Sequence, residues 1–269
     1  MTPLVAAATG LAAGIHCGTW GMFKDAPFEG FTWRTYVRSP IVATLIALAL
    51  TRIPVLDFPG GPAGIVVLWG VTYGFERAFV EIYKTFLREQ DQSKYTIPMQ
   101  FAVKGKVLRS RPLRLAAGAA YLTMGILVLV GVHLLQVRGP DLPHLLAIFL
   151  VASPGGWISA FGGAWKDAPI EGFHTFKFFR SPAMTFGFGL LLSLLTEQYV
   201  LVFMGSIGYT VASIETYKTF FFPNKKRGKF QGKTPTHPEL LRTRWRFAPV
   251  FVAIWLGVVG TAVAAFAGR

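Results

Sequence analysis

Long apolar stretches recur along the chain and are separated by polar connections that contain Pro and Gly. They fall at about residues 3–22, 40–56, 62–83, 113–137, 143–165, 182–197, 198–217 and 247–267. A helix needs about 17 to 25 mostly apolar residues to cross the hydrocarbon core of a bilayer. The pattern predicts an all-α membrane protein with eight transmembrane helices. The second helix is the weakest prediction, because Arg52 and Pro54 interrupt it.

Composition agrees with a membrane environment. Hydrophobic residues make up 52% of the chain and charged residues only 15%, against roughly a quarter charged in soluble domains. The net charge of +14 would suggest nucleic acid as a partner of a soluble protein. Beside apolar spans, the preference of Lys and Arg for cytoplasmic loops explains this charge. We therefore expect no nucleic-acid partner.

The basic residues are concentrated in every second connection. The connections after the first, third, fifth and seventh spans carry three, nine, three and nine Lys or Arg, which is 24 of the 27. Lys and Arg beside a span resist translocation across the membrane. The sequence thus predicts that these four connections face the cytoplasm and that both termini lie on the non-cytoplasmic side.

Three sequence blocks occur twice, in the same order. Lys-Asp-Ala-Pro-Phe-Glu-Gly-Phe at 24–31 returns at 166–173 with one change, and Arg-Ser-Pro follows each copy, at 38–40 and 180–182. A block that ends in Tyr-Lys-Thr-Phe lies at 74–86 and again at 208–220, and an Arg-rich segment near 109–114 is echoed near 242–246. These repeats predict a duplicated four-helix unit, 1–139 and 140–269. Four spans return the chain to its starting side, so both copies would share one orientation about a pseudo-twofold axis along the membrane normal.

The first block is expected to be a turn or short interfacial segment, because Pro27 and Gly30 both interrupt helices. One interpretation is structural, with Asp as a cap, Lys at the lipid interface and aromatic rings as anchors. The other is a pair of symmetric polar sites for a headgroup or ion. The residues of these two sites would be Lys24, Asp25 and Glu29, and Lys166, Asp167 and Glu171.

The Arg-Ser-Pro motif predicts the start of a helix. Ser39 and Ser181 suit the N-cap, and Pro40 and Pro182 suit the first helical position. Basic residues beside the predicted spans are expected to meet anionic lipid headgroups. These are Arg38, Arg180, Arg109, Arg111, Arg242 and Arg244.

The third and seventh spans carry the most informative pattern. Gly74, Ala78 and Glu81 follow one helical stripe, and the stripe recurs from Gly208 to Glu215. Small residues four apart allow two helices to approach closely in lipid, so we expect Glu81 and Glu215 in a tight, poorly hydrated helix interface. Glu81 and Glu215, with Lys84 and Lys218, are the ligand or gating candidates of these spans. The structural alternative is an ordinary ion pair with Lys84 and Lys218, three residues further along each helix.

We predict no cofactor or metal. His16 and His133 lie within spans, where a histidine can ligate haem or a pigment, but neither has a counterpart in the other half. The chain contains no Gly-rich phosphate loop or nucleophile elbow.

Three classes of function remain open. The first is movement or binding of a small anionic solute or lipid at the interface between the halves, with anionic headgroups on the cytoplasmic side as partners. The second is a non-catalytic subunit or scaffold of a larger membrane complex, or a homo-oligomer. The third is a membrane enzyme that acts on lipid headgroups through the Asp and Glu pairs.

Overall fold

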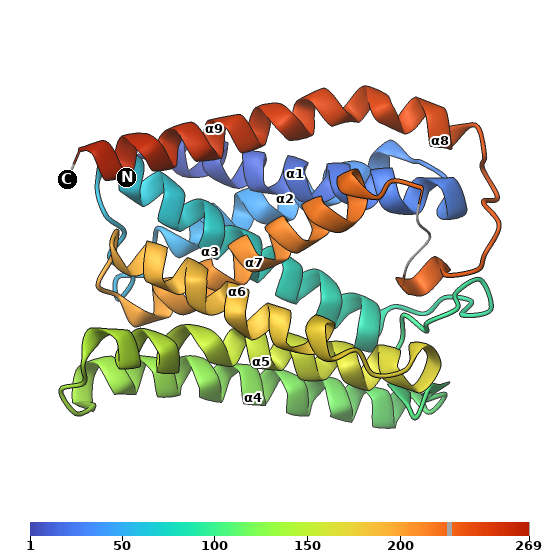
Figure 1. Ribbon diagram of the computed structural model, residues 1–269, viewed down its shortest axis with the longest axis horizontal. Coiled ribbons are helices and arrows are strands. Elements are labelled where there is room, and N and C mark those ends of the chain that lie inside the picture. The colour runs from blue at the N-terminus through green and yellow to red at the C-terminus, as the bar shows by residue number, and fades with distance from the viewer. Residues whose placement is uncertain (225–227, 269) are drawn as a thin grey trace.

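The computed structural model describes residues 1–224 and 228–268, and it is all-helical except for one short hairpin. Eight long helices form the molecule (Figure 1). They are α1 (Pro3–Glu29), α2 (Trp33–Leu50), α3 (Gly61–Ile82), α4 (Arg111–Arg138), α5 (His144–Glu171), α6 (Thr175–Ser193), α7 (Tyr199–Thr216) and α9 (Ala248–Ala267). Each contains most of one predicted apolar stretch, so the prediction of eight helices is confirmed.

Short elements connect the long helices at one end. Two π-helical turns, η1 (Tyr83–Leu87) and η2 (Tyr217–Phe221), directly extend α3 and α7. Strands β1 (Ala102–Val103) and β2 (Lys106–Val107) pair between η1 and α4, while η3 (Gly228–Phe230), α8 (Leu240–Thr243) and η4 (Arg244–Phe247) precede α9.

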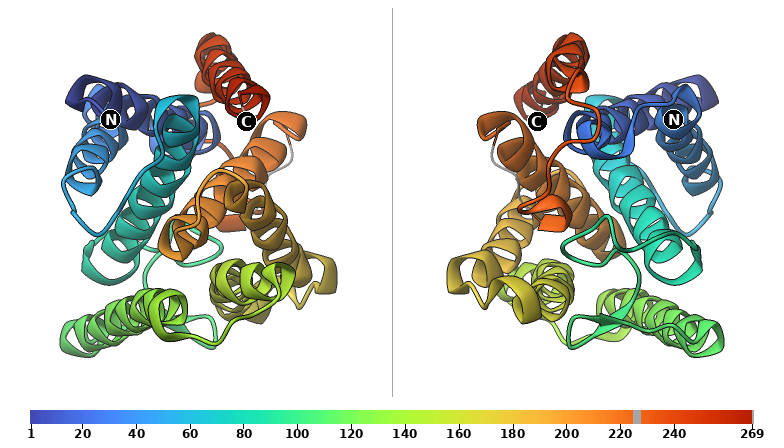
Figure 2. Two further views of the ribbon diagram at one scale, coloured as in Figure 1. Left: turned by 90° about the vertical axis from the view of Figure 1, so that its left-hand side faces the viewer. Right: turned by 90° about the vertical axis from the view of Figure 1, so that its right-hand side faces the viewer.

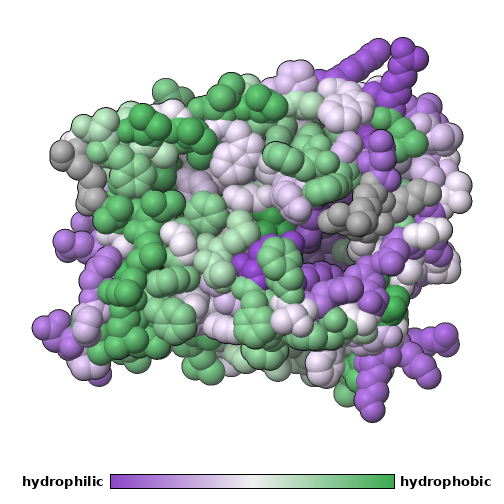
Figure 3. Space-filling view, in the orientation of Figure 1, coloured by the Kyte–Doolittle hydropathy of each residue, from purple (hydrophilic) through white to green (hydrophobic). Residues whose placement is uncertain are grey.

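The helices run side by side between two ends of a bundle. Both termini lie at one end, and the connections after α1, α3, α5 and α7 lie at the other (Figure 1). We call this second end the basic end, because these connections and the adjoining helix ends carry most of the Lys and Arg. The surface shows the same division, with hydrophilic side chains gathered at the basic end and hydrophobic ones over much of the remaining face (Figure 3).

Within the described residues, five helices are long and apolar enough to cross a membrane. They are Gly61–Leu87, Arg111–Arg138, His144–Glu171, Tyr199–Phe221 and Leu240–Ala267. This finding supports an integral membrane protein. The remaining long helices, α1, α2 and α6, stay predictions as membrane spans.

Helices α3 and α7 cross in the middle of the bundle. Helices α1 and α2 pack as a pair against α3, and α5 and α6 pack as a pair against α7 (Figure 2). The last helix of each half lies against the opposite half: α9 contacts α3 and α1, and α4 contacts α7. The two halves of the sequence are therefore interlocked.

Glycines bring α3 and α7 into backbone contact. A Cβ atom added to Gly208 would lie 1.9 Å from the carbonyl oxygen of Gly70, and one added to Gly74 would lie 2.6 Å from that of Met204. No larger residue fits such a contact, which is why small residues mark close helix crossings in membranes. The predicted close approach at Gly74 and Gly208 is confirmed, whereas Ala78 is exposed and takes no part in it.

The prediction of a turn at Pro27 is wrong, because α1 continues to Glu29 and ends only at Gly30, with φ of +78°. Pro27 has no backbone N–H to donate to the carbonyl of Phe23 one turn earlier. The guanidinium of Arg244 replaces that donor and binds the Phe23 oxygen at 2.9 Å. The carbonyl that the proline frees therefore has a donor from a distant part of the chain. The second copy of the block is also helical, because α5 passes Pro169 and ends at Glu171.

The predicted helix starts at Ser39 and Ser181 are also wrong. Helix α2 begins at Trp33, capped by the Thr32 hydroxyl, and Pro40 lies inside it. Pro182 likewise lies inside α6. The prolines mark close helix contacts, since a Cβ added to Gly14 would lie 2.4 Å from the Cα of Pro40. The same 2.4 Å separates a Cβ on Gly156 from the Cα of Pro182.

Candidate functional site

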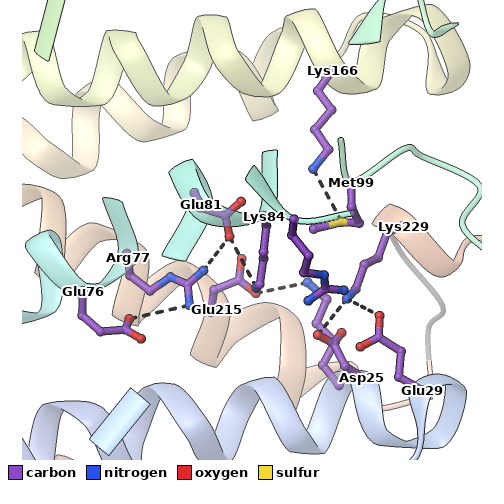
Figure 4. Close-up of polar contacts among 12 residues, drawn as sticks. Asp25, Glu29, Glu76, Arg77, Glu81, Lys84, Met99, Lys166, Glu215 and Lys229 are labelled. Carbon is purple, nitrogen blue, oxygen red and sulfur yellow. Dashed lines mark hydrogen bonds and ion pairs between the residues drawn. The ribbon is translucent and has the colours of Figure 1, made fainter. Parts of the chain in front are cut away.

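Charged side chains from several helices converge at the basic end. Figure 4 shows acidic and basic side chains from α1, α3 and α7 facing one another there, and Lys166 of α5 pointing toward Met99. The Lys166 ammonium lies 3.7 Å from the Met99 sulfur. Most of the residues proposed from the sequence thus lie in one region, which we divide into a central charge cluster and two flanking pockets.

The central charge cluster contains both predicted glutamates, each bound by two cations. Glu81 accepts from Arg77 at 2.6 Å and lies 3.8 Å from Lys84. Glu215 lies 3.4 Å from Lys218 and 3.4 Å from Lys24. The local ion pairs that the sequence offered as the structural alternative are therefore present.

The two glutamates differ in their contact with solvent. The side chain of Glu215 is 14% exposed, but that of Glu81 is 48% exposed. Both glutamates lie seven residues beyond the crossing glycine of their own helix, Gly74 or Gly208, so the difference is not one of distance along the helix. The expectation of a poorly hydrated interface therefore fits Glu215 and does not fit Glu81.

Glu76 is the most deeply buried charge of the cluster. Its side chain is fully buried, and neither carboxylate oxygen has a hydrogen-bond partner among the described residues. The nearest cation is its neighbour Arg77, whose Nη1 lies 3.7 Å away while its Nη2 donates to Glu81. The guanidinium also lies 5.1 Å from the centre of the Trp20 ring. Neither Glu76 nor Arg77 has a charged counterpart in the second half, where Thr210 and Val211 occupy the corresponding positions.

The acidic pair of the first half holds a lysine from a distant loop. Lys229 lies 2.9 Å from Asp25 and 3.1 Å from Glu29, and Glu29 also accepts from the Tyr95 hydroxyl at 2.5 Å. Burial lowers the pKa of Lys229, but the two carboxylates raise it by more, so its pKa lies above 10.5. Burial and the hydrogen bond to Glu29 raise the pKa of Tyr95. Nothing in the sequence pattern linked Lys229 or Tyr95 to Asp25.

The acidic pair of the second half holds a lysine from the neighbouring helix. Lys177 of α6 binds Asp167 and lies 3.3 Å from Glu171. The two acidic pairs therefore have the same geometry, with carboxylates four residues apart on one helix face. They receive their lysines from different elements, because Thr35 stands where the second half has Lys177.

Two cavities flank the central charge cluster. The first-half pocket, of about 90 Å³, lies between α1, α2 and α3 and is lined by Trp20, Arg38, Arg77 and Lys84 among others. The second-half pocket, of about 160 Å³, lies between α5, α6 and α7. Its charged lining consists of Asp167, Lys177, Arg180, Glu215 and Lys218. A hollow with hydrophilic walls is visible on the face shown in Figure 3.

The second-half pocket has room and charge for a small anionic group. Its volume is several times the about 30 Å³ that one water occupies in the liquid. Three cations and two carboxylates line it, which leaves one net positive charge with His174 neutral. Thr210 also lines it, is 2% exposed, and has no hydrogen-bond partner for Oγ1 in the part of the chain that the structure describes. Buried hydroxyls normally have a partner.

The predicted headgroup arginines divide into two groups. Arg109, Arg111 and Arg242 are exposed at the basic end, and Arg38 and Arg180 line the two pockets. Arg244 is a correction, because it is only 4% exposed. Its guanidinium donates to the carbonyls of Phe23 and Pro223, so it stabilises the inner end of α1 and does not face lipid.

The two histidines of the predicted spans pack to different degrees. The His16 Nδ1 lies 3.0 Å from the Tyr73 hydroxyl, and the ring stacks on Phe251 at 4.0 Å between centroids. His133 is half-buried on α4. Among residues 1–224 and 228–268, no group of three or more His, Cys, Asp or Glu side chains is placed to hold a metal ion.

Comparison of the chain with protein-family models, with curated proteins and with solved structures finds no match. The function must therefore be inferred from the geometry of the chain itself.

Proposed function

We propose that the chain is an eight-span membrane protein whose basic end faces the cytoplasm. The long helices run between the same two ends of the bundle (Figure 1). The three that are less apolar, α1, α2 and α6, lie beside the five apolar helices and would therefore cross the bilayer with them. Helix α2, with 18 residues, is about 27 Å long, close to the thickness of the hydrocarbon core. The concentration of Lys and Arg at one end supports the orientation.

We further propose that residues 1–139 and 140–269 are two copies of one four-helix unit in the same orientation. The repeated blocks fall at equivalent places of α1 and α5 and of α3 and α7. Two features of the backbone, which the repeated sequence blocks alone do not show, support this proposal. Gly30 and Gly172 end α1 and α5 with φ of +78° and +81°, and Tyr-Lys-Thr-Phe begins a π-helical turn in both halves.

The function that the geometry supports best is binding of an anionic group, from a lipid headgroup or a small solute, in the second-half pocket. The observation that carries this proposal is a net positive cavity of about 160 Å³ beside the buried, unpaired hydroxyl of Thr210. Arg180 and Lys218 would supply charge-assisted hydrogen bonds to the anion, and Thr210 would donate a further one. The ligand would therefore lie beside α7 within the second half, next to Glu215, and not on the axis between the two glutamates.

The arrangement favours binding over passage. Both pockets lie toward the basic end, whereas α3 and α7 are in backbone contact at Gly70 and Gly208. A lipid could enter sideways from the cytoplasmic leaflet, which is the leaflet with anionic headgroups.

Lipid titration of the purified chain in a non-ionic detergent tests the proposal. We expect phosphatidylglycerol to bind more tightly than phosphatidylcholine, and Arg180→Gln to weaken the binding of phosphatidylglycerol at least tenfold. A hydrogen bond to a charged group contributes about 1.5–3 kcal/mol, and about 1.4 kcal/mol corresponds to a factor of ten. Native mass spectrometry would count the bound lipids.

Arg38→Gln is the matched control, because Arg38 occupies the corresponding place in the first-half pocket. We expect the affinity of the Arg38→Gln variant for phosphatidylglycerol to stay within about twofold of that of the unaltered protein. A change away from the ligand should cost less than roughly 0.4 kcal/mol of binding free energy. Competition by glycerol phosphate would show that a free solute is also accepted. Equal binding of both lipids, or an Arg180→Gln variant that binds normally, contradicts the proposal.

A further inference from the structure

The two pockets have matching charged walls. At the spacing of the repeated blocks, Asp25 corresponds to Asp167 and Arg38 to Arg180, and each of these four residues lines the pocket of its own half. Lys84 and Lys218 line the two pockets in the same way. The pockets therefore share these three ionic positions. Glu29, Arg88 and Lys229 line only the first-half pocket, and Lys177 and Glu215 line only the second.

The wall formed by α3 or α7 differs between the pockets. Where the second half has Thr210 and Val211, the first half has Glu76 and Arg77. Arg77 lines the first-half pocket, whose volume is about 90 Å³ instead of about 160 Å³. A second difference adds bulk, because Trp20 lines the first-half pocket and its counterpart in the second half is Gly162.

The first half thus contains its own anion. The carboxylate of Glu76 stands where the second half has the hydroxyl of Thr210, and it is fully buried without a hydrogen bond from any described residue. Arg77 lies between this carboxylate and Glu81, and it lines the first-half pocket whereas Glu76 does not. Such a carboxylate requires a nearby cation. The lining of the first-half pocket is itself net positive, with five cations against Asp25 and Glu29, so the halves differ at this position by the buried carboxylate and not by the sign of the pocket charge.

We propose that Glu76 and Arg77 are a built-in anion and its counter-ion, which occupy the first-half counterpart of the ligand site. Each chain then binds one anionic headgroup or solute, beside Thr210, and not two. This inference rests on the proposed function of the second-half pocket. It adds to that function the number of anion sites per chain and the two positions in each half that determine whether its pocket can bind the anion.

Exchange of the two positions between the halves tests this inference. Thr210→Glu with Val211→Arg would give the second-half pocket its own carboxylate and guanidinium. The new arginine would lie four residues before Glu215, as Arg77 lies four residues before Glu81, so an ion pair is available to it. We expect phosphatidylglycerol binding to fall at least tenfold, with no change in the elution profile of the folded protein in size-exclusion chromatography.

The reverse exchange, Glu76→Thr with Arg77→Val, is the complementary variant. We expect the number of tightly bound phosphatidylglycerol molecules in native mass spectrometry to rise from one to two per chain. Should this variant fail to fold, Thr210→Glu with Val211→Arg decides the question. Should that variant fold poorly, Thr210→Glu alone, which introduces the carboxylate into the pocket that Arg180 and Lys218 line, is expected to give the same loss of binding.

The outcomes separate the two proposals. Binding that is lost in Arg180→Gln but unchanged in the Thr210 and Val211 variants overturns the built-in anion and leaves the second-half site in place. Two bound lipids in the unaltered chain also overturn it. Binding that is unchanged in Arg180→Gln removes the proposed site and the inference together.

Discussion

Gly208 is the residue at which a single methyl group should do most damage to the fold. A Cβ atom there would lie 1.9 Å from the Gly70 carbonyl oxygen and 2.8 Å from the Gly74 nitrogen. Both neighbours are backbone atoms, so no side chain can rotate away. Ordinary contacts of a Cβ begin near 3.4 Å, and α3 and α7 must therefore separate by about 1.5 Å locally to accept Gly208→Ala.

The expected cost follows from two opposing effects. Overpacking typically costs about 1–3 kcal/mol, and a clash between two backbones belongs at the upper end of that range. Alanine gains about 1 kcal/mol over glycine in helix propensity. The net loss of unfolding free energy for Gly208→Ala is therefore about 2 kcal/mol. Gly257→Ala in α9 is the matched control, because no atom lies within 4 Å of its added Cβ, and it keeps only the gain.

Reversible unfolding in mixed micelles of dodecyl maltoside and dodecyl sulfate, followed by circular dichroism, would measure both variants. The propensity gain is common to them, so the difference between Gly208→Ala and Gly257→Ala isolates the clash at about 3 kcal/mol. Equal stabilities would show that α3 and α7 do not touch at these glycines, and the central crossing would have to be abandoned.

Two further predictions concern the contacts that hold the basic end together. Arg244→Ala should lower the unfolding free energy by about 1.5–3 kcal/mol because it leaves the Phe23 carbonyl unpaired. In a Pro27→Ala background residue 27 can donate to that carbonyl, so a double-mutant cycle in the same micelles should show a smaller loss from Arg244→Ala. Equal losses in the two backgrounds would contradict the account of the helix at Pro27. The raised pKa of Lys229 means that its stabilising effect is complete below pH 10.5 and disappears as the pH rises through the folded-state pKa. The unfolding difference between the unaltered chain and Lys229→Met should therefore be constant near pH 8 to 9 and shrink above about pH 10.5, and a difference that grows with pH would refute the ion pair with Glu29.

The helices could be predicted from the sequence because apolar length is a local property. The close approach of α3 and α7 was also predictable, since Gly74 and Gly208 recur at one place in both repeats. The effect of the prolines was not predictable. Pro27 lies inside a helix although it frees the Phe23 carbonyl, and Arg244, which pairs that carbonyl, lies 217 residues away in the chain.

The candidate site could be predicted only as a set of residues. Repetition indicated Asp25 and Asp167 and their neighbours, but the lysine that binds each of them comes from a loop in one case and from α6 in the other. The pockets depend on side-chain volume at positions such as Val211, which has no chemical signature. The difference between the halves was visible at Glu76 and Arg77, but its consequence required the fold.

The helix crossing and the proposed site depend on the same backbone. Thr210 follows Gly208 by two residues, or about 3 Å along α7. A separation of α3 and α7 at Gly208 would therefore move the Thr210 hydroxyl by about the same distance as the helices separate. Glu215 lies five residues beyond Thr210 toward the basic end, and its carboxylate is already 3.4 Å from the Lys24 ammonium. That ion pair joins α1 of the first half to α7 of the second, and it would be lost before the pocket walls of α5 and α6 were disturbed. The glycines therefore do more than allow two helices to pack: they set the position of α7, which carries Thr210 in the wall of the second-half pocket, relative to α3.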